Sequence, residues 1–177
     1  MDQYRKSPRA NFLDYDGGPY FVTVCTKEQR HYFGEIENDE MILSEIGRYL
    51  ESELSLASTY SPNIDIPLFT VMPNHFHAII CIKGEYVPTQ QNGDVIQLRS
   101  PNPSQKVCAD SKRQVPLLSR YIASLKGAVT KFAKSLGVEF AWQGRYYDRY
   151  IRNNEEGNKI AEYIMNNVAR WSAEKFN

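Results

Sequence analysis

The sequence has few cysteines and lacks the long apolar runs of a secreted or membrane protein. Its 177 residues include only three cysteines, Cys25, Cys81 and Cys108, which are far apart and form no C-x-x-C pair. An odd, dispersed set argues against a disulfide framework and against a cysteine-rich zinc site. No apolar run approaches the ~20 residues of a membrane span, and the N-terminal segment does not resemble a signal peptide. We therefore expect a cytoplasmic protein without membrane contact.

The sequence also lacks net charge and the common nucleotide-binding and hydrolase motifs. It has 21 basic and 21 acidic residues, whereas nucleic-acid-binding domains are usually basic. There is no Walker loop, G-x-G-x-x-G, H-E-x-x-H or G-x-S-x-G. The charge is nevertheless uneven, because residues 32–65 hold eight acids and one base while residues 112–152 hold nine bases and two acids. This asymmetry fits either one basic and one acidic face or chance clustering on a solvated surface.

The spacing of apolar residues predicts an α+β fold in one domain spanning residues 1–177. Strands are expected at 19–26, 64–72, 75–82 and 146–151, a hairpin turns at 37–39, and helices run from 44 to about 60, from 116 to 137 and from 153 to about 171. Without the hairpin and the last helix, the order is βαββαβ. That order predicts a ferredoxin-like antiparallel sheet with helices on one face. Residues 83–115 are polar and predict a mobile insertion loop.

Two of the three histidines, His75 and His77, lie on one predicted strand. Side chains at i and i+2 of a strand share a face, and their Cα atoms lie roughly 6.6 Å apart. Two imidazoles so placed can converge on one metal ion. They can equally be two partly buried, hydrogen-bonded histidines without a metal.

The last predicted helix carries Tyr163 and Asn167 one turn apart, on one face. Helical periodicity places Asn167 inside the apolar stripe and Tyr163 at its edge. Because a buried amide needs partners, these residues form either a metal-binding amide beside a phenol nucleophile or a backbone-bonded asparagine beside a rim tyrosine.

Basic residues gather in the second half of the chain. Arg145, Arg149 and Arg152 alternate with tyrosines near Trp142, a pattern that suits single-stranded nucleic acid but is also typical of a strand with aromatic core residues. On the helix from 116 to 137, helical angles place three further cations on one stripe, which we expect to face DNA: Arg120, Lys131 and Lys134.

Four segments together resemble the single-tyrosine HUH transposases, and among them the REP-associated tyrosine transposases. These segments are MPNHFHAII, LSRYIASLKGAVTKFA, WQGRYYDRYIRN and EYIMNN, in the order of that family. The resemblance implies that His75, His77 and Asn167 hold Mg²⁺ or Mn²⁺ and that Tyr163 is the nucleophile. It also implies that Lys126 lies near the DNA. Family members include dimers in which the tyrosine helix serves the partner's site, so monomer and homodimer both stay open.

The function expected from this resemblance is cleavage and rejoining of single-stranded or hairpin DNA through a 5′-phosphotyrosine. A free phenol has a pKa near ~10, so it needs activation at neutral pH. A non-catalytic nucleic-acid-binding protein, domesticated from a transposase, is the alternative. A metal-dependent hydrolase in which Tyr163 only packs is a third interpretation.

Overall fold

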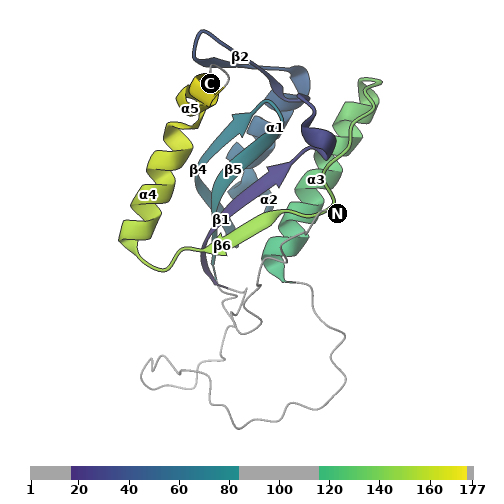
Figure 1. The fold of residues 1–177 in the computed structure, drawn as a ribbon. Coiled ribbons are helices and arrows are strands. Elements are labelled where there is room, and N and C mark those ends of the chain that lie inside the picture. Colours follow the sequence, from purple (N-terminus) through teal and green to yellow (C-terminus); the bar gives the residue numbers. More distant parts are fainter. Residues whose placement is uncertain (1–16, 84–115, 175–177) are drawn as a thin grey trace, which may run out of the picture.

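The chain forms one four-stranded antiparallel sheet and a separate two-stranded hairpin (Figure 1). The computed structural model describes residues 17–83 and 116–174, so the predicted insertion from 84 to 115 lies outside the described residues. The sheet has the strand order β4–β5–β1–β6. Its strands are β1 Gly18–Cys25, β4 Ile64–Met72, β5 His75–Ile82 and β6 Tyr147–Tyr150, and the hairpin is β2 Gly34–Glu37 with β3 Glu40–Leu43. The predicted α+β class and antiparallel sheet are confirmed.

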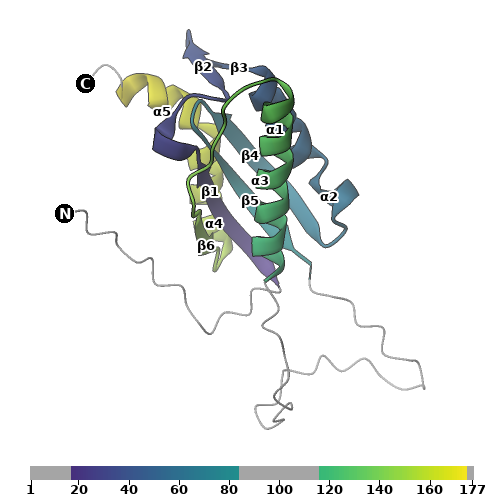
Figure 2. The same cartoon turned by 90° about the vertical axis from the view of Figure 1, so that its right-hand side faces the viewer.

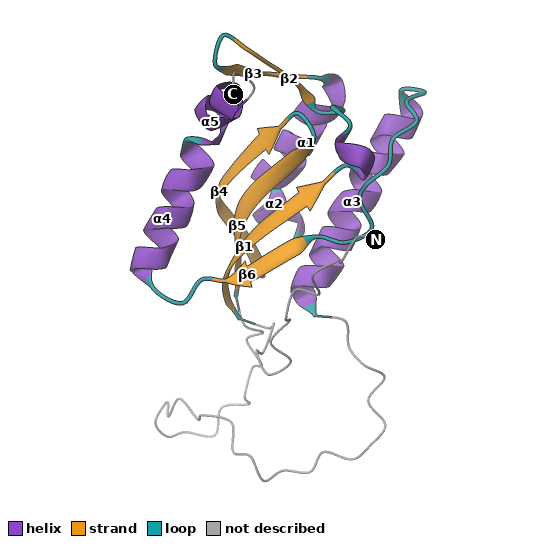
Figure 3. Ribbon diagram, in the orientation of Figure 1, coloured by secondary structure: helices purple, strands orange, loops and turns teal. Residues whose placement is uncertain are grey.

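Helices lie on both sides of the sheet (Figures 1 and 2). On one side are α1 Glu45–Ser55, the short α2 Ala57–Tyr60 and α3 Leu117–Ser135. On the other side are α4 Asn154–Met165 and α5 Asn167–Glu174. A short loop joins β6, at the sheet edge, to α4 (Figure 3). Within the described part of the chain, no helix is long and apolar enough to cross a membrane.

Local sequence signals set several of these element boundaries. The hydroxyl of Ser44 caps α1 by accepting a hydrogen bond from Gly47 N at 3.0 Å, and Asn153 Oδ1 caps α4 by accepting one from Glu156 N at 2.8 Å. At the end of α3, Gly137 has φ +73°, and its N–H donates to the carbonyl of Lys134. This left-handed glycine ends the helix, as glycine commonly does.

Three predicted helix boundaries are wrong. The last helix is not continuous, because α4 ends at Met165 and α5 begins at Asn167. The break falls at Asn166, in a pair of asparagines, and asparagine has a low helix propensity. The helix predicted to run to residue 60 is similarly interrupted at Leu56, and α3 begins one residue after Pro116.

The alternation of side chains along the central strands separates a core face from a site face. On β1 and β5, every second residue is buried in the cluster that packs against α1 and α3. These core residues are Tyr20, Val22, Val24, Phe76, Ala78 and Ile80. The intervening residues, including Phe21, Thr23, His75 and His77, point to the opposite face of the sheet. That face is the one covered by α4.

Candidate active site

The structure brings His75 and His77 together on the α4 side of β5. Their Nε2 atoms lie 3.1 Å apart. In the register of the sheet, His77 stands opposite Thr23 of β1, and His75 stands opposite Cys25. Both imidazoles are therefore carried by one central strand, β5, beside the other central strand, β1.

The second ring nitrogen of each histidine is held by a neighbouring polar side chain. His75 Nδ1 lies 2.6 Å from Asn74 Oδ1, and the Asn74 amide donates to the carbonyl of Gln29 at 3.2 Å. This second bond directs Oδ1 toward the ring, so His75 Nδ1 carries the proton and its Nε2 carries a lone pair. His77 Nδ1 lies 2.8 Å from Thr23 Oγ1. Metal-ligating histidines commonly have such outer partners, which fix the orientation of the ring.

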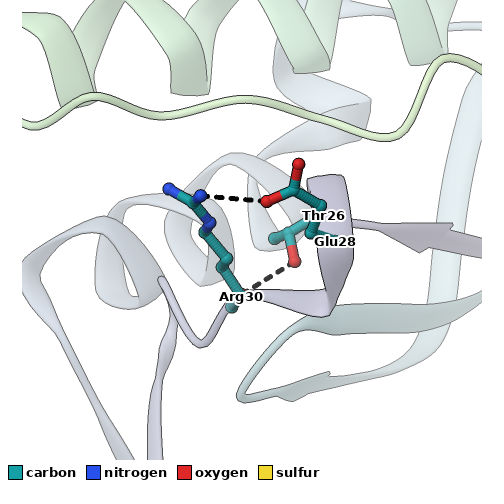
Figure 4. A network of polar contacts seen from close by, with 3 residues as sticks. All are labelled: Thr26, Glu28 and Arg30. Atoms are coloured by element: carbon teal, nitrogen blue, oxygen red, sulfur yellow. Dashed lines mark hydrogen bonds and ion pairs between the residues drawn. The ribbon is translucent and has the colours of Figure 1, made fainter.

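The loop after β1 is held together by contacts among Thr26, Glu28 and Arg30 (Figure 4), and it also holds Asn74 in place. The hydroxyl of Thr26 lies 2.9 Å from the carbonyl of Asn74 and 2.7 Å from that of Arg30. An ion pair between Arg30 and Glu28, at 2.9 Å, closes the turn. Glu28 and Gln29 adopt φ values of 55° and 52°, a left-handed conformation that is uncommon for residues other than glycine and often marks functional sites. The turn thus presents the Gln29 carbonyl to Asn74.

Burial keeps both histidines neutral. It lowers the pKa of His75 to about 4. Burial, together with the adjacent His75, lowers the pKa of His77 to about 3. Desolvation penalises the charged imidazolium, and two imidazoliums this close would also repel each other. Neutral rings at physiological pH keep lone pairs available to a metal ion.

Helix α4 places Tyr163 over this pair. The Tyr163 hydroxyl lies 3.3 Å from His77 Nε2, and the two ring centroids are 5.1 Å apart. Phe21 packs between the strand and the helix, stacked on His77 and edge-on to Tyr163. Asn167, the first residue of α5, has a buried side chain.

Helix α5 adds two residues that the sequence analysis missed. The Trp171 ring lies 5.7 Å from that of His75 and 6.1 Å from that of His31. The guanidinium carbon of Arg170 lies 5.7 Å from the centre of the Tyr163 ring. On the continuous helix predicted from the sequence, spacings of seven and eight residues would place both near the side of Tyr163, and that periodicity could have identified them.

The donors fit a single divalent ion. Two ligands at right angles, each ~2.1 Å from one ion, stand about 3.0 Å apart, close to the observed 3.1 Å between the Nε2 atoms. Among residues 17–83 and 116–174, no group of three His, Cys, Asp or Glu side chains could hold a metal. A third ligand from the described residues would therefore come from another type of side chain, and the amide of Asn167 is the candidate.

Comparison with known proteins identifies one relative in sequence and a solved structure with a similar fold. No family model matches the chain. It is 32% identical over 174 residues to an uncharacterized protein of Haemophilus influenzae, in an alignment that covers 97% of this chain and 92% of the relative. The chain belongs to the family of that protein. Among solved structures, it resembles a REP-associated tyrosine transposase bound to a REP hairpin, with a TM-score of 0.57 and 19% identity over 96% of this chain and 74% of that one. The chain therefore has a transposase-like fold.

The predicted DNA-binding residues of α3 lie away from the histidines. Arg120, Lys131 and Lys134 are exposed on α3, which covers the other side of the sheet (Figure 2). Lys126 is half-buried, where its ammonium donates to the carbonyl of Gln143 at 2.8 Å. Burial lowers the pKa of Lys126. The structure therefore does not bring these four residues to the site of Tyr163.

The segment around β6 divides between core and surface. Trp142, Tyr146 and Tyr150 pack against the hydrophobic core, as in the strand interpretation, whereas Tyr147 is 45% exposed. Arg145 and Arg152 are exposed as well. Arg149 stands opposite Phe21 in the sheet register and forms an ion pair with Glu156 of α4. Of the predicted DNA-binding residues, Arg149 thus shares the sheet face of the histidines.

Proposed function

We propose that the chain cleaves and rejoins single-stranded or hairpin DNA through a covalent bond to Tyr163. The observation that carries this proposal is the position of the Tyr163 hydroxyl, 3.3 Å from His77 Nε2. A phenol beside two neutral imidazoles can act as the nucleophile of phosphoryl transfer when a metal ion held there activates it. The transposase-like fold supports the same reaction. The site residues come from one chain, so the proposal needs no exchange of the tyrosine helix between subunits.

In the proposed step, Tyr163 Oη attacks the phosphorus of a phosphodiester. A bond forms between Oη and phosphorus, and the bond from phosphorus to the 3′ oxygen breaks. The phenol loses its proton and the departing 3′ oxygen takes one up, so the products are a 5′-phosphotyrosine and a 3′-hydroxyl. Because the phosphoester bond is conserved, a 3′-hydroxyl can reverse the step and join strands without ATP.

The remaining residues hold and orient the reacting groups. His75, His77 and Asn167 would hold Mg²⁺ or Mn²⁺, which when bound polarises the phosphate and neutralises developing charge. Asn74 and Thr23 fix the two imidazole rings through their outer nitrogens. Phe21 stacks on His77 and packs against the Tyr163 ring, so it supports both rings.

The test is the formation of a covalent protein–DNA adduct. Labelled hairpin oligonucleotides with randomised single-stranded flanks are incubated with the protein and Mg²⁺ or Mn²⁺, and adducts are separated on a denaturing gel. We expect an adduct with the parent and none with Tyr163→Phe, which loses only the hydroxyl. Tyr147→Phe, an exposed tyrosine on the same sheet face, is the matched control and should react like the parent.

Other results would contradict the proposal in distinct ways. An undiminished adduct in Tyr163→Phe would assign the nucleophile elsewhere. Undiminished cleavage in EDTA, or by the His77→Ala variant, would show that the reaction does not need a metal ion. DNA binding by the parent without any adduct would favour the non-catalytic nucleic-acid-binding protein instead.

A further inference from the structure

Arg170 is placed over the proposed nucleophile. Its guanidinium carbon lies 5.7 Å from the centre of the Tyr163 ring. Tyr163 is near the end of α4 and Arg170 is in the first turns of α5, so the two side chains come from helices on either side of the break at Asn166. The side chain of Arg170 is exposed, which leaves it open to a bound ligand.

The helical geometry explains how Arg170 reaches Tyr163. Seven residues correspond to about two helical turns, or about 10 Å along a helix axis. Side chains on a helix lean toward its N-terminus, so the long arginine side chain extends back along the helix face toward Tyr163. The same helical face carries Asn167, whose side chain is buried. The contact between Arg170 and Tyr163 shows that both side chains lie on one side of the two helices, across the break at Asn166.

Among the described side chains, which on α5 end at Trp171, Arg170 has no carboxylate partner. Two other arginines near the site are neutralised, since Arg30 pairs with Glu28 and Arg149 pairs with Glu156. A guanidinium binds phosphate oxygens through two parallel hydrogen bonds, and it is the side chain best suited to this geometry. An exposed guanidinium beside the proposed phenol nucleophile is therefore suited to hold the phosphate that the phenol attacks.

We infer that Arg170 binds the non-bridging oxygens of the phosphate under attack and acts as a catalytic residue. This inference rests on the proposed function. The oxygens around phosphorus carry the negative charge of the transition state as Tyr163 Oη attacks, and a fixed cation beside them stabilises the transition state more than the ground state. Arg170 itself forms and breaks no covalent bond. Its ligand is a DNA phosphodiester, recognised by charge and shape independently of the base sequence.

The inference is tested by the rate of adduct formation at saturating DNA. Parent, Arg170→Gln, Arg170→Lys and Lys159→Gln are compared in single-turnover reactions with the reactive oligonucleotide. Loss of one donor to a developing anion typically lowers the rate constant by 100-fold or more, so we expect about a 100-fold fall in Arg170→Gln. Arg170→Lys keeps the charge but not the paired hydrogen bonds, so its rate constant should lie between those of the parent and Arg170→Gln. Lys159→Gln removes one cation from α4, where it pairs with Glu155, and should react like the parent.

The outcomes separate the inference from the proposed function. If Arg170→Gln lowers the rate constant at saturating DNA by more than about fivefold, while circular dichroism shows an unchanged fold, Arg170 acts in the transition state. A smaller change overturns the inference, even if DNA affinity falls, because Arg170 would then contribute only to ground-state binding or packing. If the parent forms no adduct at all, the proposed function fails and the inference fails with it.

Discussion

The two buried histidines should make the stability of the protein fall as the pH falls below 7. Folding lowers the pKa of His75 to about 4 and that of His77 to about 3, from 6.5. In acid, the unfolded chain therefore binds protons that the folded chain does not bind. Stability rises with pH wherever the unfolded state binds more protons. As the pH falls, the protein therefore loses stability. The loss begins near the pKa of the unfolded histidines, 6.5, and ends below the pKa values of the folded ones.

The size of this effect follows from the two pKa differences. Each unfolded histidine, with a pKa of ~6.5, is about three-quarters protonated at pH 6 and almost fully protonated at pH 5. The folded histidines stay almost entirely neutral over that range. Each proton contributes about 1.36 kcal/mol per pH unit. The nearly two protons bound by the unfolded chain therefore lower the free energy of unfolding by about 2 kcal/mol between pH 6 and pH 5. The loss from pH 7 to pH 5 is about 4 kcal/mol by the same linkage.

The assay is urea unfolding at several pH values, with EDTA present so that no bound metal adds to the stability. The free energy of unfolding of the parent is compared with that of a His75→Gln, His77→Gln double variant, whose side chains stay neutral throughout. The other ionisable groups are common to both proteins, so their effects cancel in the difference. We expect the difference to change by about 2 kcal/mol between pH 6 and pH 5. Parallel pH profiles would refute the reasoning, because they would mean that the folded protein accepts these protons freely.

Two further predictions concern metal and DNA. Thr23→Val removes the hydrogen-bond partner of His77 Nδ1 and should raise the metal concentration needed for adduct formation by about 10–100-fold. Thr23→Ser keeps the hydroxyl, so its metal requirement should stay near that of the parent. Equal metal requirements in all three proteins would show that the hydroxyl does not orient the ring. The double change Lys131→Ala, Lys134→Ala should flatten the slope of log K against log salt for single-stranded DNA by about 1.4, measured by fluorescence anisotropy. A slope equal to that of the parent would place the DNA away from this face of α3.

The elements predicted best are those set by local chemistry. Strand β5 was predicted with the bounds that the structure has, because an eight-residue apolar and aromatic run follows the Pro73–Asn74 turn directly. The hairpin turn was predicted from Asn38 and Asp39, both of which adopt the positive φ that such turns require. The caps Ser44 and Asn153 are similarly local. In each case, neighbours in the sequence decide the conformation.

The parts that were missed depend on contacts between distant segments. Thr23 meets His77 only because β1 and β5 pair in one register, and a shift by one residue would turn Thr23 to the core face. No local signal identifies the role of Asn74, because its partner Gln29 lies 45 positions earlier in the chain. The histidines could be identified from their spacing alone. The residues that orient them are identified only by the pairing of the strands.

The positions of the basic residues restrict the path of any DNA that contacts both sides of the protein. Tyr163 lies on the α4 side of the sheet, whereas Lys131 and Lys134 lie on α3, across it (Figure 2). Hydrogen-bonded strands leave no opening through a sheet. A DNA strand that contacts all three residues therefore has to pass around an edge of the sheet. Tyr146, directly before the edge strand β6, contacts Ser119 of α3, and Arg149 projects from β6 on the Tyr163 side. The salt-slope measurement on the α3 lysines therefore decides between DNA that passes around the β6 edge and DNA confined to the α4 face.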